Sequence, residues 1–254
     1  MINIHHVANT GFLLQYNGKK ILIDGIHTKQ VDPYYSVDQS TLDKIIHGEP
    51  PFDHLDLLLF THYHWDHLDG ESTLTVLKNQ PNLTLFSSKQ TIDYIKTMAN
   101  YDSTIDTQLV FGELNLKSIQ NYSINGIDFS AISLLHDGDQ YKEVVNFSYI
   151  IKFDEQSVFH CGDAKPSLYN FENLGLSELD ITIALLDFPY ISLSSGRKVI
   201  NSFIQPEQIF LMHLPDIEKD SYNWLKTVHK IVVRYGDTLP KMTLCEKPNT
   251  EYEV

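Results

Sequence analysis

A dense group of metal-binding side chains directly follows a short apolar run, and this combination constrains the fold more than any other part of the sequence. The run Leu57-Leu58-Leu59-Phe60 predicts a strand that is buried on both faces. It leads into Thr61-His62-Tyr63-His64-Trp65-Asp66-His67, which places four potential ligands within six residues. Trp65 and Gly70 favour a compact loop over a continued strand. Such polar groups are unfavourable at the end of a buried strand unless a partner neutralises and orients them, and a metal ion does both.

The chemistry of this loop is typical of a catalytic metal centre. Imidazole and carboxylate together suit zinc, manganese or iron, and the absence of cysteine disfavours a closed structural zinc site. The alternative is a histidine-rich surface loop without a ligand role. The spacing His62-x-His64-x-Asp66-His67 favours the metal site, because it matches a specific chemical template rather than a bias in composition.

Four further apolar runs also end in histidine or aspartate. The residues that end them are Asp24, His136, Asp163 and His213. Taken singly, each would be interpreted as structural; Asp24, for example, could be a cap, a salt-bridge partner or an acceptor that fixes the tautomer of a ligating histidine. Because random placement rarely gives such a series, we interpret His136, Asp163 and His213 jointly with the central loop as metal ligands.

Length, charge and cysteine content narrow the classes of function. The 254 residues contain no linker-like or low-complexity tract, so we expect one compact domain over residues 1–254. The net charge of -14, from 33 acidic and 19 basic residues, repels phosphate backbones and argues against a general nucleic-acid binder, while leaving room for a local cationic pocket. Two cysteines are too few for a disulfide framework, and the sequence has neither a signal-peptide pattern nor a membrane-spanning run. We therefore expect a cytoplasmic protein without a membrane partner.

The alternation of short apolar runs with amphipathic segments predicts sheets with helices outside them. In addition to residues 57–60, strands are expected at residues 2–4, 11–16, 20–23, 83–86, 109–111, 114–119, 127–135, 145–153, 157–161, 208–212 and 242–245. Helices are expected at residues 40–46, 71–78, 89–98 and 217–235, and a polar tail from residue 246. We expect exposed strand positions at His5 and His6, and packed side chains at His160 and Cys161.

In chain order, the candidate ligands form one series from Asp24 through the central loop to His213. This series resembles that of the metallo-β-lactamase superfamily, and the resemblance covers residues 4 to about 213. It implies an αββα sandwich, in which two mixed β-sheets pack face to face with helices outside. The segments 6–13 and 185–189 further resemble bacterial hydrolases related to ascorbate-phosphate lactonase.

Carried over residue by residue, the resemblance implies a site for two divalent metal ions. Zinc is favoured, and the same donors accept manganese or iron. Asp24 becomes a carboxylate that supports the metal loop, and His64 departs from the diiron oxygen-reducing branch, which has a carboxylate in the first motif. The implied ligands are His62, His64 and His136 for one ion, Asp66, His67 and His213 for the other, and Asp163 as the bridge.

The implied chemistry is hydrolysis by an activated water. Two divalent ions about 3.5 to 4 Å apart lower the pKa of a shared water to about 7, which makes metal-bound hydroxide available as the nucleophile. Asp66 and Asp163 are the expected catalytic carboxylates, and Asp66 could exchange a proton with the attacking water or the leaving group. We expect a hydrolase of a small-molecule ester, lactone or amide. The alternatives are a phosphodiesterase acting on a small phosphodiester and a metal-binding regulatory protein without turnover.

Substrate contacts are expected from the segment before His213. Arg197, together with the amides of a helix that starts near Ser194, could bind a carboxylate or phosphate of an anionic small molecule. Equally, Ser194 could cap that helix while Arg197 forms a surface ion pair. Tyr190 is a candidate donor to a developing oxyanion. In the long connection 26–54, the residues that could touch substrate, or pack as a surface loop, are His27, Tyr34 and Tyr35.

Overall fold

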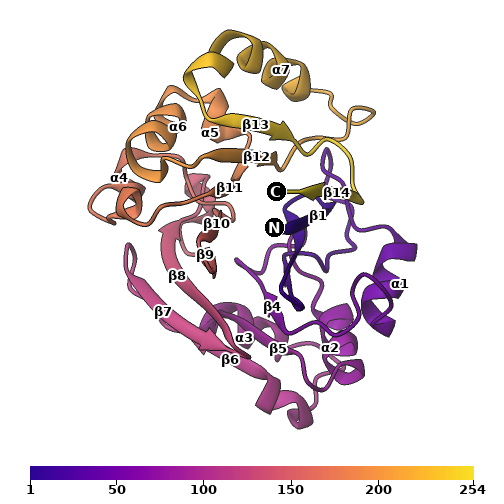
Figure 1. Ribbon diagram of the computed structural model, residues 1–254. Coiled ribbons are helices and arrows are strands. Elements are labelled where there is room, and N and C mark those ends of the chain that lie inside the picture. The colour runs from indigo at the N-terminus through magenta and orange to yellow at the C-terminus, as the bar shows by residue number, and fades with distance from the viewer. The chain divides into compact units, whose positions relative to one another are not determined.

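Two seven-stranded mixed sheets form the framework of the chain (Figure 1). The computed structural model describes residues 1–254, and the contacts within it divide the chain into two units. Unit 1 contains residues 1–113, 123–127 and 247–254, and unit 2 contains residues 114–122 and 128–246. Two mixed sheets with helices confirm the predicted α/β class. Whether the two units together form the single domain expected over residues 1–254 stays a prediction.

The sheet of unit 1 has the strand order β14-β1-β2-β3-β4-β5-β6. Strands β1, β2 and β3 form antiparallel hairpins, and β3 to β6 are parallel, with a helix in each of the three connections. Because β3 and β4 run in the same direction, the residues that follow them leave the same edge of the sheet. The strands are β1 (Asn3–Ala8), β2 (Gly11–Tyr16), β3 (Lys19–Ile23), β4 (Leu57–Leu59), β5 (Thr84–Ser88), β6 (Leu109–Gly112) and β14 (Thr250–Glu253).

The helices of unit 1 bury their apolar faces in one core with the strands. In α1, Asp38 caps the first turn by accepting a hydrogen bond from Thr41 N, and Gly48 ends the helix with a φ of 63°. Leu42 and Ile45 of this helix lie in the same buried cluster as the strand residues of the sheet. The helices are α1 (Gln39–His47), α2 (Gly70–Asn79), α3 (Lys89–Ile95) and the short 3-10 helix η1 (Ser103–Gln108).

The sheet of unit 2 has the strand order β13-β12-β11-β10-β9-β8-β7. Strands β10 to β13 are parallel, while β9 is antiparallel to both β8 and β10. Strands β8, β10 and β12 therefore share one direction, and their carboxyl ends lie at one edge of this sheet. The strands are β7 (Ile119–Ile124), β8 (Ile127–Leu135), β9 (Val145–Phe153), β10 (Gln156–His160), β11 (Ile183–Asp187), β12 (Gln208–Met212) and β13 (Lys241–Leu244).

Most helices of unit 2 are short, and α5 and α6 pack closely against each other. Gly196 in α6 is required by this packing, since a Cβ atom there would lie 2.4 Å from the carbonyl oxygen of Tyr190 in α5. The elements are α4 (Leu168–Phe171), α5 (Pro189–Ser192), α6 (Ser194–Val199), the π-helical η4 (Ile200–Ile204), α7 (Trp224–Tyr235), and the 3-10 helices η2 (Asp139–Tyr141), η3 (Leu176–Glu178) and η5 (Gly236–Thr238).

Three expectations about secondary structure are wrong in part. The strand expected at 114–119 lies instead at Ile119–Ile124, because Lys117 with a φ of 60° and a turn bond from Ser118 N to Asn115 O interrupt the earlier segment. The helix expected at 217–235 begins only at Trp224. The polar tail contains β14, which pairs antiparallel with β1.

The expectation that His5 and His6 are exposed is also wrong, since both are buried. Pairing with β14 makes β1 an inner strand, with Glu251 opposite His5 and Thr250 opposite His6. His6 also packs against Phe12, with ring centroids 5.1 Å apart. Burial lowers the pKa of both imidazoles, so the fold favours their neutral forms.

None of the helices is long and apolar enough to cross a lipid bilayer. The cytoplasmic location stays a prediction.

Candidate metal centre

The loop that follows β4 in unit 1 is compact, as the sequence predicts. It folds back on itself, since the amides of His67 and Leu68 both donate to the carbonyl oxygen of His64, at 3.0 and 2.9 Å. The amide of Asp69 then donates to Ile26 O at 2.7 Å, which attaches the end of the loop to the segment after β3. The loop therefore has a fixed backbone from which its side chains project.

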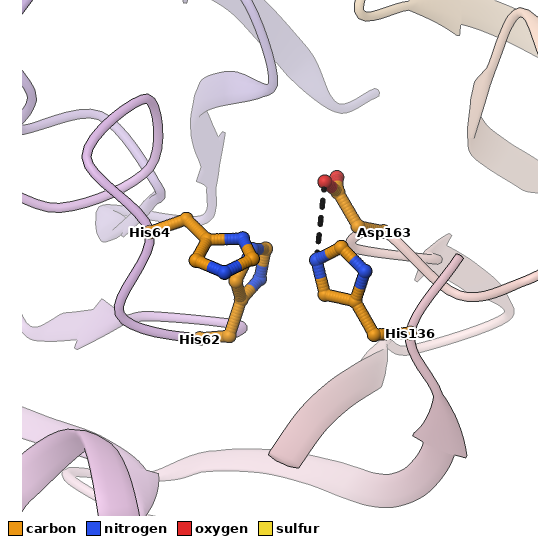
Figure 2. Close-up of side chains that lie close together, drawn as sticks. All are labelled: His62, His64, His136 and Asp163. Atoms are coloured by element: carbon orange, nitrogen blue, oxygen red, sulfur yellow. Dashed lines mark hydrogen bonds and ion pairs between the residues drawn. The ribbon is translucent and has the colours of Figure 1, made fainter. Parts of the chain in front are cut away.

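The first two histidines of the loop bring ring nitrogens to one point. His62 Nε2 and His64 Nδ1 lie 3.0 Å apart, and the two rings meet edge to face (Figure 2). His62 is buried and its Nδ1 lies 3.0 Å from Thr61 Oγ1. Two imidazole nitrogens that converge in this way have the arrangement that ligands of one cation need.

A buried carboxylate orients the last histidine of the loop. Asp24 follows β3, and its Oδ1 accepts from Thr61 N at 2.8 Å while its Oδ2 accepts from Thr61 Oγ1 at 2.6 Å. The same Oδ2 lies 2.8 Å from His67 Nδ1, and both side chains are fully buried. This contact makes Nδ1 the protonated nitrogen of a neutral His67 and gives Nε2 the lone pair, which is the tautomer a metal ligand needs. His67 Nε2 faces Asp66 Oδ2 at 4.0 Å.

The turn between β1 and β2 supports the same loop, although no pattern in the sequence assigns its residues this role. Asn9 Nδ2 donates to Asp66 O at 3.0 Å, and Thr10 Oγ1 lies 3.1 Å from His67 Nδ1. The sequence Asn9-Thr10-Gly11 between two apolar strands is a turn signal. It does not reveal which loop the turn contacts, because that contact depends on the tertiary fold.

Two candidate ligands of unit 2 face each other although they follow β8 and β10, the strands on either side of β9. His136 Nε2 lies 3.5 Å from Asp163 Oδ2 (Figure 2). His136 Nδ1 donates to the carbonyl oxygen of Asp137, which leaves its Nε2 as the nitrogen on the side of the carboxylate. The backbone of Asp163 is fixed by two hydrogen bonds, from Asp137 N to Asp163 O at 2.8 Å and from Asp163 N to Asn146 Oδ1 at 2.9 Å.

The third candidate of unit 2, His213, follows β12 and is buried. Its φ of 56° is in the left-handed region, as is the φ of 45° at Asp24 in unit 1. Backbone of this kind is uncommon for residues other than glycine and costs on the order of 1 kcal/mol. At both positions the unusual turn redirects the chain immediately after a strand, where the candidate ligand or its support is required.

Tyr190 and Arg197, two of the three expected substrate residues, make contacts within the fold. Tyr190 is fully buried, burial raises the pKa of its phenol, and its hydroxyl donates to Ala164 O at 2.9 Å. Arg197 Nη1 donates to Ile191 O at 2.6 Å, and its guanidinium stacks on Tyr235 at 4.1 Å from the ring centroid.

The alternative roles expected for Ser194, as a helix cap, and for Arg197, as a partner in a surface ion pair, are wrong. Ser194 does not cap α6, because Leu193 occupies the cap position and no side chain bonds there. Arg197 binds carbonyl oxygens instead of a surface acid. The roles of Tyr190, Ser194 and Arg197 in substrate binding stay predictions.

Other histidines and cysteines lie in the interior. His160 and Cys161 are fully buried, which confirms their expected packing roles, and burial raises the pKa of the Cys161 thiol. His27 is fully buried, and its Nε2 lies 3.4 Å from Ala8 O. Burial is the main cause that lowers the pKa of its imidazole to about 4. Of the two roles left open for His27, the packed one agrees with this environment.

The side chains at the candidate centre fit divalent metal ions. Both units supply imidazole and carboxylate donors without a thiolate, and the groups that could hold an ion are drawn from these donors. At His67 and His136 the second ring nitrogen is already bound, so the tautomer is set before any ion arrives. This chemistry suits zinc, manganese or iron and does not choose among them.

The sequence matches the family model of the beta-lactamase superfamily domain over residues 27–184, which is more than half of the chain. The chain belongs to the metallo-β-lactamase superfamily, and its two mixed sheets with helices have the composition of that fold. The resemblance stated from the ligand series is thereby confirmed. Curated protein sequences give no match. The lactonase-like branch stays a prediction.

Solved structures show the same fold at low identity. A possible metal-dependent hydrolase from Veillonella parvula DSM 2008 is 15% identical with a TM-score of 0.68, and the alignment covers 100% of both chains. The isothiocyanate hydrolase from Delia radicum gut bacteria is 12% identical with a TM-score of 0.67 and 99% of each chain covered. The diiron β-hydroxylase CmlA from Streptomyces venezuelae is 13% identical with a TM-score of 0.65, covering 100% of this chain and 54% of that chain. Neighbours thus include both named hydrolases and a diiron enzyme, so the fold leaves the metal open.

Proposed function

We propose that the protein is a metal-dependent hydrolase that acts on an ester, lactone or amide bond of a small molecule. The observation that carries this proposal is the buried Asp24–Thr61–His67 network, which holds the His67 tautomer and places its Nε2 beside Asp66. A network of this kind is a second layer of support around a metal ligand. Family membership and the donor groups at the strand ends of unit 2 support the same conclusion.

In this proposal the cofactor would be two divalent ions, with zinc favoured and manganese or iron as alternatives. When bound, such ions supply a water-derived nucleophile at neutral pH and stabilise the negative charge that develops on the substrate. The residues that would hold the ions are His62, His64, Asp66 and His67 of unit 1 and His136, Asp163 and His213 of unit 2.

The chain itself supplies orientation and proton transfer. Asp24 keeps the proton of a neutral His67 on Nδ1, and the bond to Asp137 O does the same at His136. Asp66 has a partly exposed side chain, so it can pass a proton to a leaving group, whereas Asp163 is held through its backbone by Asn146. The net charge of -14 favours a small-molecule substrate over a nucleic acid.

A substrate panel with metal-loaded protein tests the proposal. The panel contains a lactone, an ester, a thioester and bis-p-nitrophenyl phosphate, and it is run on the wild type and on His64→Ala. We expect hydrolysis of at least one carboxylic substrate and its loss in His64→Ala. The matched control is His229→Ala, because His229 is exposed on α7 and pairs with Glu246 at 3.1 Å.

The outcomes separate the alternatives. Turnover of the phosphate diester alone would replace the proposal by a phosphodiesterase. Tight metal binding without turnover of any substrate would replace it by a metal-binding regulator. Equal activity in His64→Ala and in His229→Ala would remove the metal loop from the mechanism.

A further inference from the structure

A cation and an exposed indole form a pair on the metal loop. Trp65 stands between the candidate ligands His64 and Asp66, yet 55% of its surface is exposed. The ammonium nitrogen of Lys29, from the segment after β3, lies 2.9 Å from the centroid of its ring. Such a pair contributes little to stability at an exposed site, so stability alone does not explain a large apolar ring in this position.

The segment that carries Lys29 is fixed to the end of the same loop. Thr28 Oγ1 donates to Asp69 Oδ2 at 2.9 Å, and Asp69 N donates to Ile26 O at 2.7 Å. Ile26 also forms a parallel bridge with Leu68. Lys29 and Trp65 therefore belong to one framework, and their separation depends on backbone contacts as well as on the attraction between cation and ring.

The charge of Lys29 is not balanced by an acid. Lys19 and Lys20, in the preceding strand β3, form ion pairs with Asp56 at 2.9 Å and with Asp53 at 2.7 Å. Lys29 has the indole face as its contact, in a chain whose net charge is -14. Arg197, the cation expected to bind anions, already donates to two carbonyl oxygens. Lys29 is thus a cation that lies against the metal loop through Trp65 and is open to an anionic ligand.

We propose that Lys29 and Trp65 form an anion subsite that binds a carboxylate or phosphate group of the substrate, remote from the bond that is hydrolysed. The inference rests on the proposed hydrolase function and names its substrate class as small anionic molecules. The indole covers one side of the ammonium group and limits the water around it, which strengthens attraction to an anion on the open side. The cation orients the substrate and takes no part in bond breaking, so Lys29 is a positioning residue.

A matched pair of substrates tests the subsite on metal-loaded protein. Monomethyl glutarate carries a carboxylate, and methyl 4-carbamoylbutanoate replaces it by a neutral amide of similar size. We expect Lys29→Gln to raise KM for the anionic ester by about two- to fivefold and to leave kcat and the neutral ester unchanged. Lys29→Arg should restore the preference, and high salt should weaken it in the wild type. Lys44→Gln, which removes an exposed lysine of α1, should behave as the wild type.

A binding measurement separates this inference from the proposed function. In Trp224→Phe, Trp65 is the single tryptophan, and its emission is titrated with glutarate, inorganic phosphate and neutral glutaramide. We expect a saturable change with an anion and none with glutaramide. Adding Lys29→Gln to this variant should weaken the anion response by about two- to fivefold. The anion that binds more tightly identifies the substrate group as carboxylate or phosphate.

The outcomes distinguish failure of the proposed hydrolase function from failure of the anion subsite. Anion binding that depends on Lys29, without hydrolysis of any ester, would keep the subsite and reject the proposed function. Hydrolysis with the same KM for both esters in Lys29→Gln and wild type would reject the subsite. An emission response that is unchanged in Lys29→Gln would reject it as well.

Discussion

The two units supply candidate ligands in different ways. In unit 1 the four donors lie on one loop, residues 62–67, and a buried carboxylate from the neighbouring strand, Asp24, holds the loop and one of its histidines. In unit 2 the donors His136, Asp163 and His213 follow three separate strands. Their backbones are fixed by the sheet, by main-chain hydrogen bonds and by the side-chain amide of Asn146.

This difference predicts which half is sensitive to a single change. The loop of unit 1 depends on a charged group without solvent contact, and loss of one partner in such a network leaves the other buried and unsatisfied. The strand ends of unit 2 depend on many backbone contacts, so no one side chain carries their geometry. Unit 1 should therefore respond more strongly than unit 2 to removal of a supporting side chain.

The largest effect is expected at Asp24. In Asp24→Asn the side chain cannot accept from Thr61 N, Thr61 Oγ1 and His67 Nδ1 at once without placing an amide donor against another donor. We expect a loss of about 3 kcal/mol in the free energy of unfolding and a 10- to 100-fold weaker metal affinity, on the order seen for such supports. Urea unfolding and competition with a chelator measure the two quantities. Unchanged metal affinity would show that the network serves only the fold.

Acidification should also affect unit 1 first. Three of its buried histidines, His5, His6 and His27, have lowered pKa values, and that of His27 falls from 6.5 to about 4. In the unfolded chain an imidazole becomes protonated below pH 6.5, whereas in the folded chain His27 stays neutral until about pH 4. The free energy of unfolding therefore falls as the pH falls through this window. His27 alone accounts for about 3 kcal/mol.

Two single-tryptophan variants follow the units separately. Trp224→Phe reports on unit 1 through Trp65, and Trp65→Phe reports on unit 2 through Trp224. Between pH 7 and 4.5 we expect the urea midpoint to fall further for the Trp65 reporter, and His27→Gln to reduce that fall. Equal shifts for both reporters would contradict the assignment of this pH dependence to unit 1.

A smaller effect is expected at Asn146, the side-chain support of unit 2. Its Oδ1 accepts from Asp163 N at 2.9 Å, and its Nδ2 donates to Cys161 O at 3.2 Å. Cys161 O keeps a second donor, Ser148 Oγ at 2.6 Å, so Asn146→Ala chiefly leaves the Asp163 amide without its acceptor. We expect a loss of about 1 to 3 kcal/mol in unfolding free energy. Metal affinity should fall less than in Asp24→Asn, and a larger fall would reverse the comparison between the units.

The same contrast explains what the sequence could predict. The loop 61–67 is recognisable because its donors are adjacent in the chain and follow an apolar run, so local pattern suffices. The donors of unit 2 can be recognised only as a series, since each follows an apolar strand and none is distinctive alone. The strand bounds at Ile127–Leu135 and Val145–Phe153 agree with the sequence, because long apolar runs between turns define them.

Contacts that depend on the tertiary fold could not be predicted. Thr250–Glu253 has a polar sequence, and it becomes a strand because its backbone pairs with the edge of β1. Asn9 and Thr10 signal a turn but not its contact with the metal loop. Lys29 has no distinguishing neighbours in the sequence, and its position over Trp65 follows from the bonds of Thr28 and Asp69.

The late start of α7 provides the smallest prediction and a control for unit 2. Asp220 accepts from Trp224 N and Leu225 N, both at 2.9 Å, which fixes the first turn of the helix well after residue 217. Asp220→Ala should lower the unfolding free energy by about 1 kcal/mol, as reported by Trp224 emission. Because Asp220 bonds none of the candidate ligands, metal affinity should stay at the wild-type value. A loss of affinity in Asp220→Ala would mean that the weaker binding expected of Asn146→Ala reflects general destabilisation of unit 2 and not the position of Asp163.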